Sequence, residues 1–78
     1  MKDVRSREPI LAQVGKRIRS LREGRGISQE VLAEKSSLHR TYIGGVERGL
    51  RNPSLKSLQR IAKGLGVGVV DLFQTTKD

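Results

Sequence analysis

The sequence lacks the residues on which disulfide-bonded and metal-binding domains depend. It contains no cysteine and a single histidine, His39, among 78 residues. These absences exclude disulfide scaffolds, zinc fingers, cysteine-ligated clusters and any site built from several histidines. We therefore expect no metal and no other cofactor, and we expect no small-molecule ligand. The absence of cysteine is also compatible with a reducing compartment.

Aromatic side chains are equally scarce, since Tyr42 and Phe73 are the only two. Proteins that bind single-stranded nucleic acid stack bases on aromatic side chains, so this scarcity argues against that class. No apolar run approaches the roughly 18 residues that a membrane helix needs. The N-terminus, MKDVRSREP, lacks the apolar stretch of a secretory signal. We therefore expect a cytoplasmic protein with no membrane partner.

Positive charge, in contrast, is in excess. The chain has 16 lysines and arginines against 8 acidic residues, which gives a net charge of +8. Such a balance favours an anionic partner, most often nucleic acid. A chain of this length forms one domain, and its small core is marginal by itself, so that oligomerisation would stabilise it.

The apolar residues step by three or four along the whole chain, which predicts an all-α fold without strands. We expect a domain over residues 9–74, between a flexible basic tail at 1–8 and a short polar tail at 75–78. Proline, glycine and serine mark where the helices begin and end. The five predicted helices span residues 9–24, 29–36, about 39–48, about 54–66 and 69–73.

The segment from Gln29 to Arg48 has the organisation of a helix-turn-helix. Two short helices are separated by a brief turn. Ala33 provides the small residue where the second helix crosses the first, and Ile43 and Val46 provide apolar residues that face the core. A plain helical hairpin has similar spacing and remains the alternative at this point.

The wider pattern resembles the Cro/repressor (Xre-type) helix-turn-helix family. The stretch SQEVLAEKSSLHRTYIGGVERGLRNPSLKSLQRIAKGLGV combines S-Q at the start of a helix with I-x-x-V-E-R-G, N-P-S and L-x-x-I-A-x-x-L-G-V. Within the family, LHRTYIGGVERGLRNPS resembles the controller proteins of restriction–modification systems. The resemblance implies a five-helix, lambda-repressor-like domain. It also implies a homodimeric transcriptional regulator that binds a near-palindromic operator in double-stranded DNA.

The resemblance further implies that the third helix enters the major groove. It assigns base contacts to residues at the start and middle of this helix: His39, Arg40, Thr41, Gly44 and Gly45. The guanidinium of Arg40 has the geometry to bond guanine. Each glycine costs about 1 kcal/mol of helix stability relative to alanine. The pair either lets the helix sit deeper in the groove or relieves crowding, and we favour the first explanation.

The same resemblance assigns supporting roles around that helix. Phosphate contacts fall to Gln29, Arg48, Arg51 and Asn52, and a structural ion pair to Arg22 and Glu47. The last helix has more apolar surface than so short an element needs, so we expect a dimer interface there. Its predicted members are Leu50, Val69, Val70, Leu72 and Phe73. Ser37 stands where the family commonly has glycine, and a left-handed serine there would cost about 1–2 kcal/mol unless the turn differs.

Other functions are weighed against this interpretation. An enzyme is not expected, because His39 lies near two serines but no orienting acid or oxyanion hole accompanies it. An antitoxin that uses the same fold and also binds a partner protein remains the alternative. RNA polymerase is a further candidate partner, through Glu30 and Glu34 one turn apart, although we favour a solubilising surface as the role of these acids.

Overall fold

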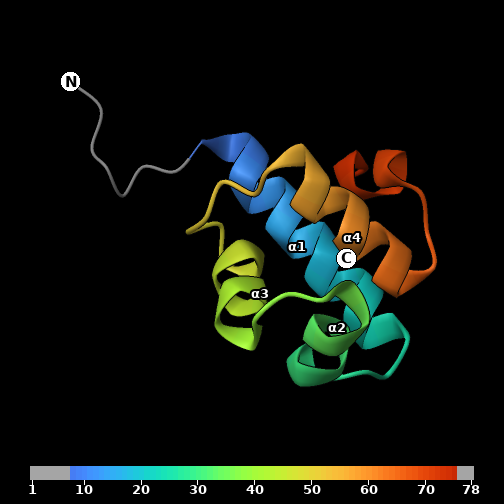
Figure 1. Ribbon diagram of the computed structural model, residues 1–78. Coiled ribbons are helices and arrows are strands. Elements are labelled where there is room, and N and C mark those ends of the chain that lie inside the picture. The colour runs from blue at the N-terminus through green and yellow to red at the C-terminus, as the bar shows by residue number, and fades with distance from the viewer. Residues whose placement is uncertain (1–7, 76–78) are drawn as a thin grey trace.

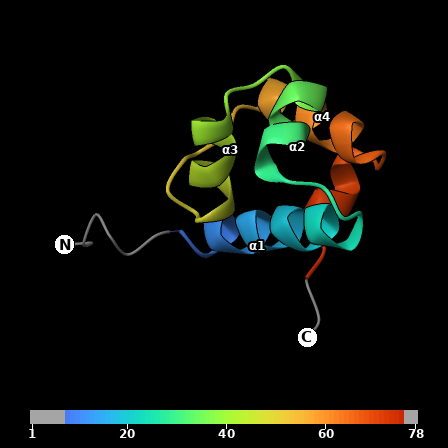
Figure 2. The same cartoon turned by 90° about the horizontal axis from the view of Figure 1, so that it is seen from below.

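A computed structural model describes residues 8–75 (Figure 1). They form four α-helices and one short 3-10 helix, and these described residues contain no strand. In Figure 2, α1 runs along one side of the molecule and α2, α3 and α4 lie above it. No helix among the described residues is long and apolar enough to cross a membrane. The elements are α1 (Pro9–Gly24), α2 (Gln29–Ser36), α3 (Arg40–Glu47), α4 (Leu55–Leu65) and η1 (Val69–Phe73).

The predicted all-α class is confirmed, but the number of α-helices is four rather than five. The last segment has five residues, little more than one turn, and short segments of this kind tighten into 3-10 geometry. The Asp71 carboxylate accepts a hydrogen bond from the Gly68 backbone N–H at 2.9 Å and holds the start of this turn. The predicted tails, residues 1–8 and 75–78, lie outside the described residues apart from Glu8 and Thr75.

The helix boundaries follow from local chemistry at their ends. The Ser28 hydroxyl accepts a hydrogen bond from Val31 N–H, and the Ser54 hydroxyl accepts one from Ser57 N–H. Each serine thereby satisfies a backbone donor that the first turn leaves unpaired. Ser37 ends α2 with φ 58°, the left-handed conformation that is one of the two options left open by the sequence. Ser28 and Ser54 therefore set where α2 and α4 begin, and Ser37 sets where α2 ends and the chain turns toward α3.

One apolar core joins all five elements. Every helix contributes apolar side chains to it, and the partly buried Leu21, Ile27, Leu38 and Tyr42 pack around it. The buried members are Val14, Ile18, Leu32, Ala33, Ile43, Val46, Leu58, Ile61, Ala62, Leu65 and Leu72. Because α3 contacts both α1 and α2, its orientation follows from this core.

The backbones of α1 and α3 approach each other closely at Gly15. A Cβ atom added at this glycine would lie 2.6 Å from the Glu47 carbonyl oxygen, and it would lie closer still to the carbonyl oxygen of Val46. No side chain fits between the two backbones at this point. Gly15 is not among the residues predicted from the sequence to matter, although it lies directly after Val14 in the buried stripe of α1.

Candidate nucleic-acid interface

The inner face of α3 is buried against the rest of the domain. Ile43 and Val46 are almost fully buried, and Ala33 is buried on α2, which packs against α3. This arrangement is the one that the helix-turn-helix spacing predicts. The apolar contacts leave the beginning of α3, at Arg40 and Thr41, exposed to solvent.

A buried ion pair fixes the C-terminal end of α3 to α1. Arg22 Nε donates to Glu47 Oε2 at 2.6 Å and Nη2 donates to Oε1 at 3.1 Å, while Nη1 donates to the Ile27 carbonyl at 2.9 Å. The side chains of Arg22 and Glu47 are only 11% and 2% exposed. The hydrogen bonds that Arg22 donates to Glu47 raise the pKa of the Arg22 guanidinium above its ordinary value. The pair therefore links α1, the following loop and α3 in one geometry.

Gln29 extends this network toward the surface. Its Nε2 donates to Glu47 Oε1 at 3.0 Å, so the residue assigned to a phosphate contact also carries an internal bond. A side-chain amide nitrogen has two hydrogens, which leaves one for an outside acceptor. Gln29 is the first residue of α2, where backbone N–H groups and the helix dipole favour an anion.

Three of the predicted base-contacting residues lie together at the start of α3. His39 is the N-cap residue and makes no side-chain capping bond. His39, Arg40 and Thr41 are all exposed. A hollow beside them is lined by His39, Thr41 and Tyr42 from this end of α3, and by Arg51 from the loop that follows the helix.

The structure does not support base-facing positions for Gly44 and Gly45, and this prediction requires correction. Both glycines are buried, beneath side chains of the protein itself. A Cβ atom at Gly45 would lie 2.7 Å from Cγ of Arg51, and one at Gly44 would lie 3.3 Å from Nη1 of Arg48. The glycines therefore make room for neighbouring arginines. Relief of crowding, the alternative explanation, is the one that fits.

Arg51 lies across α3 rather than free in solvent. Its guanidinium carbon is 5.6 Å from the centre of the Tyr42 ring, a cation–π distance. Together with Arg40 and Arg48 it places positive charge around the exposed part of α3, and Asn52 is exposed beside it in the loop. From the sequence, Tyr42 is predicted only as an apolar residue of the third helix. Its position next to Arg51 is a tertiary contact that no local pattern signals.

The residues assigned to a dimer interface separate into two groups. Leu72 is fully buried in the core, so it cannot contact a partner, and this prediction is wrong. Val69 is half-buried, while Val70, Phe73 and Leu50 are exposed. The η1 segment has one inward side, and Leu72 fills it.

An exposed apolar surface does exist near η1. Two of its members, Ile10 and Leu55, were not predicted from the sequence to belong to it. Leu55 at the start of α4 is 73% exposed and Val70 is 75% exposed. Ile10 and Phe73 line one hollow of this surface, and Leu55 lines another. We call Ile10, Leu55, Val70 and Phe73 the apolar end. Val70 lines neither hollow and is included because it lies in η1 between Val69 and Phe73, whereas Leu50, which also lines neither, lies in the loop after α3.

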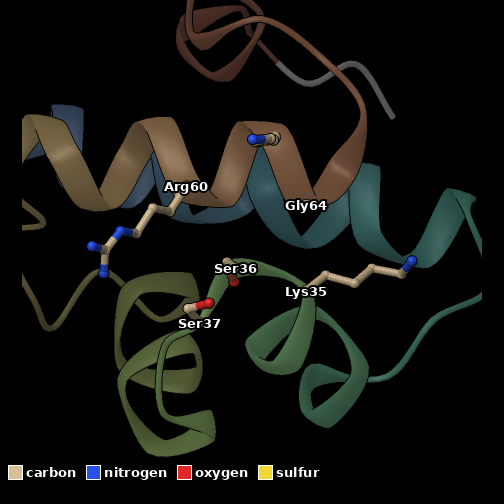
Figure 3. A pocket seen from close by; sticks show the side chains of 6 residues that line it. Lys35, Ser36, Ser37, Arg60 and Gly64 are labelled. Atoms are coloured by element: carbon tan, nitrogen blue, oxygen red, sulfur yellow. The ribbon is translucent and has the colours of Figure 1, made fainter.

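A further hollow lies between α2 and α4 and is lined by Lys35, Ser36, Ser37, Arg60, Lys63 and Gly64. Figure 3 shows the side chains of Lys35 and Arg60 extending in opposite directions. Their charges therefore do not converge on one point. They add to the positive surface of the domain without forming a separate anion site.

Comparison with known proteins agrees with this geometry. A helix-turn-helix family model matches residues 18–72. The control protein C.BamHI of Bacillus amyloliquefaciens is 46% identical over 63 residues, which cover 80% of this chain and 78% of that protein. The crystal structure of the restriction–modification controller protein C.AhdI from Aeromonas hydrophila has a TM-score of 0.80 and 48% identity, and the match covers 81% of this chain and 96% of that one.

A second solved structure carries DNA. The controller protein C.Esp1396I, as a tetramer in complex with its natural 35 base-pair operator, has a TM-score of 0.79 and 47% identity. The match covers 85% of this chain and 87% of that one. The chain therefore belongs to the Xre-type helix-turn-helix family, alongside the controller proteins of restriction–modification systems.

Proposed function

We propose that this protein is a transcriptional regulator that binds a near-palindromic operator in duplex DNA as a homodimer, in the manner of a restriction–modification controller protein. The observation that carries this proposal is the exposure of Arg40 and Thr41 at the start of α3, a helix whose other side is locked to α1. The B-form major groove is wide enough to admit such a helix. As a fold we propose the lambda-repressor-like arrangement, with η1 in the place of the fifth helix.

Sequence readout falls to the first turn of α3. The terminal nitrogens of Arg40 can donate to O6 and N7 of one guanine, and Thr41 offers a hydroxyl group and a methyl group to a neighbouring base. His39 lies where the helix begins. In a two-fold dimer, two such helices reach half-sites about 34 Å apart, or a multiple of that distance.

Orientation on the duplex falls to residues on either side of α3. Gln29 begins α2, and Arg48, Arg51 and Asn52 follow α3, so that contacts to phosphates are available from both directions. Phosphate contacts position a protein on DNA, whereas base contacts select the sequence. The net charge of +8 supports the same assignment.

For the two-fold contact we propose the apolar end, with Val69 at its edge. A small core gains from covering apolar surface with a second copy of the chain. Leu50, exposed in the loop after α3, remains a predicted contact. The interaction with RNA polymerase remains a prediction from the sequence, and a cytoplasmic location goes with a function on DNA.

Substitution of Arg40 tests the function directly. A preferred duplex is first selected from a random-sequence pool by the wild-type protein. Arg40→Ala should then lose about 1–3 kcal/mol of binding free energy on this duplex and relax the preference at one base pair of each half-site. Titrations on the selected and a scrambled duplex measure both effects. An unchanged ratio between the two duplexes would show that α3 does not read the bases as proposed.

Arg51→Ala is the matched control, because it removes the same side chain from a position assigned to phosphate. This variant should weaken binding to both duplexes by the same factor. It should also lower the slope of log affinity against log salt by about one unit for each phosphate that the variant no longer neutralises. The two variants differ because a base contact decides which sequence is preferred, whereas a phosphate contact strengthens binding to every sequence.

A further inference from the structure

Arg40, the arginine proposed to read a base, forms an ion pair with an acidic residue. Arg40 Nε lies 3.3 Å from Oε2 of Glu30, which stands in the first turn of α2. Their side chains are 61% and 62% exposed. Arg48 and Arg51, the two arginines assigned to phosphates, form no ion pair within residues 8–75. Among the three arginines proposed to contact DNA, Glu30 therefore pairs with the one whose orientation would determine which DNA sequence is preferred.

We propose that Glu30 is a positioning residue that directs Arg40, and that it thereby sets how strongly this protein discriminates its operator from other DNA. This inference rests on the proposed function, since it concerns the same readout. It assigns Glu30 a role on the DNA-binding face, in addition to any effect of its charge on solubility.

The geometry allows Glu30 and a guanine to hold Arg40 at the same time. A guanidinium group has five N–H donors, and the ion pair to Glu30 uses the side that carries Nε. The terminal nitrogens remain for O6 and N7 of guanine, which need two donors. A carboxylate on the Nε side also restricts rotation of the guanidinium plane, so less freedom is lost when the base is bound.

The same ion pair weakens binding where guanine is missing. Arg40 without a base partner could otherwise swing to a phosphate and strengthen binding to any sequence. Glu30 offers it a competing anion and repels nearby phosphates. An exposed ion pair is weak in water, so it does not prevent transfer of Arg40 to its base. The ion pair between Glu30 and Arg40 becomes stronger when the DNA interface excludes water, and at that stage the orientation of the guanidinium determines whether it meets its base.

Glu34 provides a matched control on the same helix. It lies one turn after Glu30, is exposed, and forms no ion pair among the described residues. Glu30→Gln and Glu34→Gln each remove one negative charge from α2 and keep the side-chain shape. Both should raise the affinity for the scrambled duplex. Only Glu30→Gln should change the selectivity.

The experiment measures the ratio of affinities for the selected duplex and its scrambled version, by titration at two salt concentrations. Glu30→Gln should lower this ratio about fivefold and relax the preference at the base pair read by Arg40, whereas Glu34→Gln should leave the ratio at the wild-type value. In an Arg40→Ala background, Glu30→Gln should no longer change the ratio. Loss of a charge that only stabilises α2 would shift the melting temperature without moving the ratio.

Two results would overturn the inference. One is a Glu30→Gln variant that keeps the wild-type ratio, and the other is an equal fall in the ratio with and without Arg40. Both leave the proposed function intact, because the wild-type protein still discriminates between the duplexes. If the wild-type protein enriches no duplex from the random pool, the proposed function fails and the role of Glu30 fails with it.

Discussion

The two sides of α3 hold their charged residues in opposite ways. On the inner side, Glu47 is almost fully buried and accepts bonds from Arg22 on α1 and Gln29 on α2. On the outer side, Arg40 meets Glu30 at 3.3 Å and both side chains are mostly exposed. The buried network determines where the helix lies. The exposed pair leaves the arginine able to change partners, as the base contact proposed for it requires.

Two glycines repeat this contrast at the level of the backbone. A Cβ atom at Gly15 would collide with backbone carbonyls of α3, and one at Gly45 would collide with the side chain of Arg51. A backbone can give way only if a helix moves, whereas a long side chain can rotate. The first glycine is therefore a requirement of the fold, and the second is an adjustable part of the surface.

The largest effect is expected for Gly15→Ala. The added methyl group would push α1 away from α3, and we expect a loss of about 3 kcal/mol or more of unfolding free energy, the top of the range for overpacking, because the contacts are with backbone atoms. Thermal unfolding followed by circular dichroism measures it. Gly24→Ala is the control, because a Cβ atom there would meet nothing within 4 Å. If the two variants melted at the same temperature, the tight crossing of α1 and α3 would be refuted.

Glu47→Gln tests the buried network and should rank second. It removes the counter-charge that is hydrogen-bonded to the partly buried Arg22 guanidinium, at an expected loss of about 3 kcal/mol, near the lower end for buried pairs. The control is Glu23→Gln, which removes an exposed pair with Arg19 and should cost less than about 1 kcal/mol. Urea unfolding of both variants measures the difference. Equal losses would mean that burial does not distinguish the two pairs.

Val70→Glu tests whether a single subunit binds the selected duplex as tightly as the dimer does. Val70 is exposed, so the variant should fold, but as a monomer with affinity for the selected duplex reduced on the order of a hundredfold. Sedimentation and DNA titration measure the two properties. Val31→Glu, at an exposed valine of α2, should leave the dimer intact. A dimer that persisted in both Val70→Glu and Leu55→Glu would place the two-fold contact elsewhere.

The smallest effect is expected for Gly45→Ala. The methyl group displaces Arg51 from Tyr42 and removes an interaction of about 0.5–1 kcal/mol, while alanine gains about 1 kcal/mol as a helix former. The net change in unfolding free energy should stay within about 0.5 kcal/mol. The ring protons of Tyr42 should shift in the NMR spectrum as Arg51 leaves. A destabilisation as large as that of Gly15→Ala would remove the distinction between the two glycines.

Much of the fold was predictable because its signals are local. Helix positions follow from apolar residues at steps of three and four, and from serines that bond their own helix ends, as Ser28 and Ser54 do. The pairing of Arg22 with Glu47 came instead from resemblance to a family. The two residues lie 25 positions apart in the sequence, and no periodicity joins them.

The errors arose where a local pattern leaves the direction of a side chain open. In η1, five residues are too few to define an apolar stripe, so Leu72 was assigned to a partner although it fills the core. The sequence shows that Gly44 and Gly45 lack side chains, but it does not show which residues occupy the space beside them. The arginines that occupy the space come from the end of α3 and the loop after it.

The sequence by itself determined the helical class, the cap at Ser28 and the charge that favours DNA, since these depend on composition and on contacts a few residues apart. Only the tertiary structure decided that α1 meets α3 at Gly15, that Arg51 lies on Tyr42, and that Glu30 lies 3.3 Å from Arg40. Each of these contacts joins residues of different helices or of a helix and a loop. Their distance is set by the packing of the whole core, and the order of residues along the chain does not contain it.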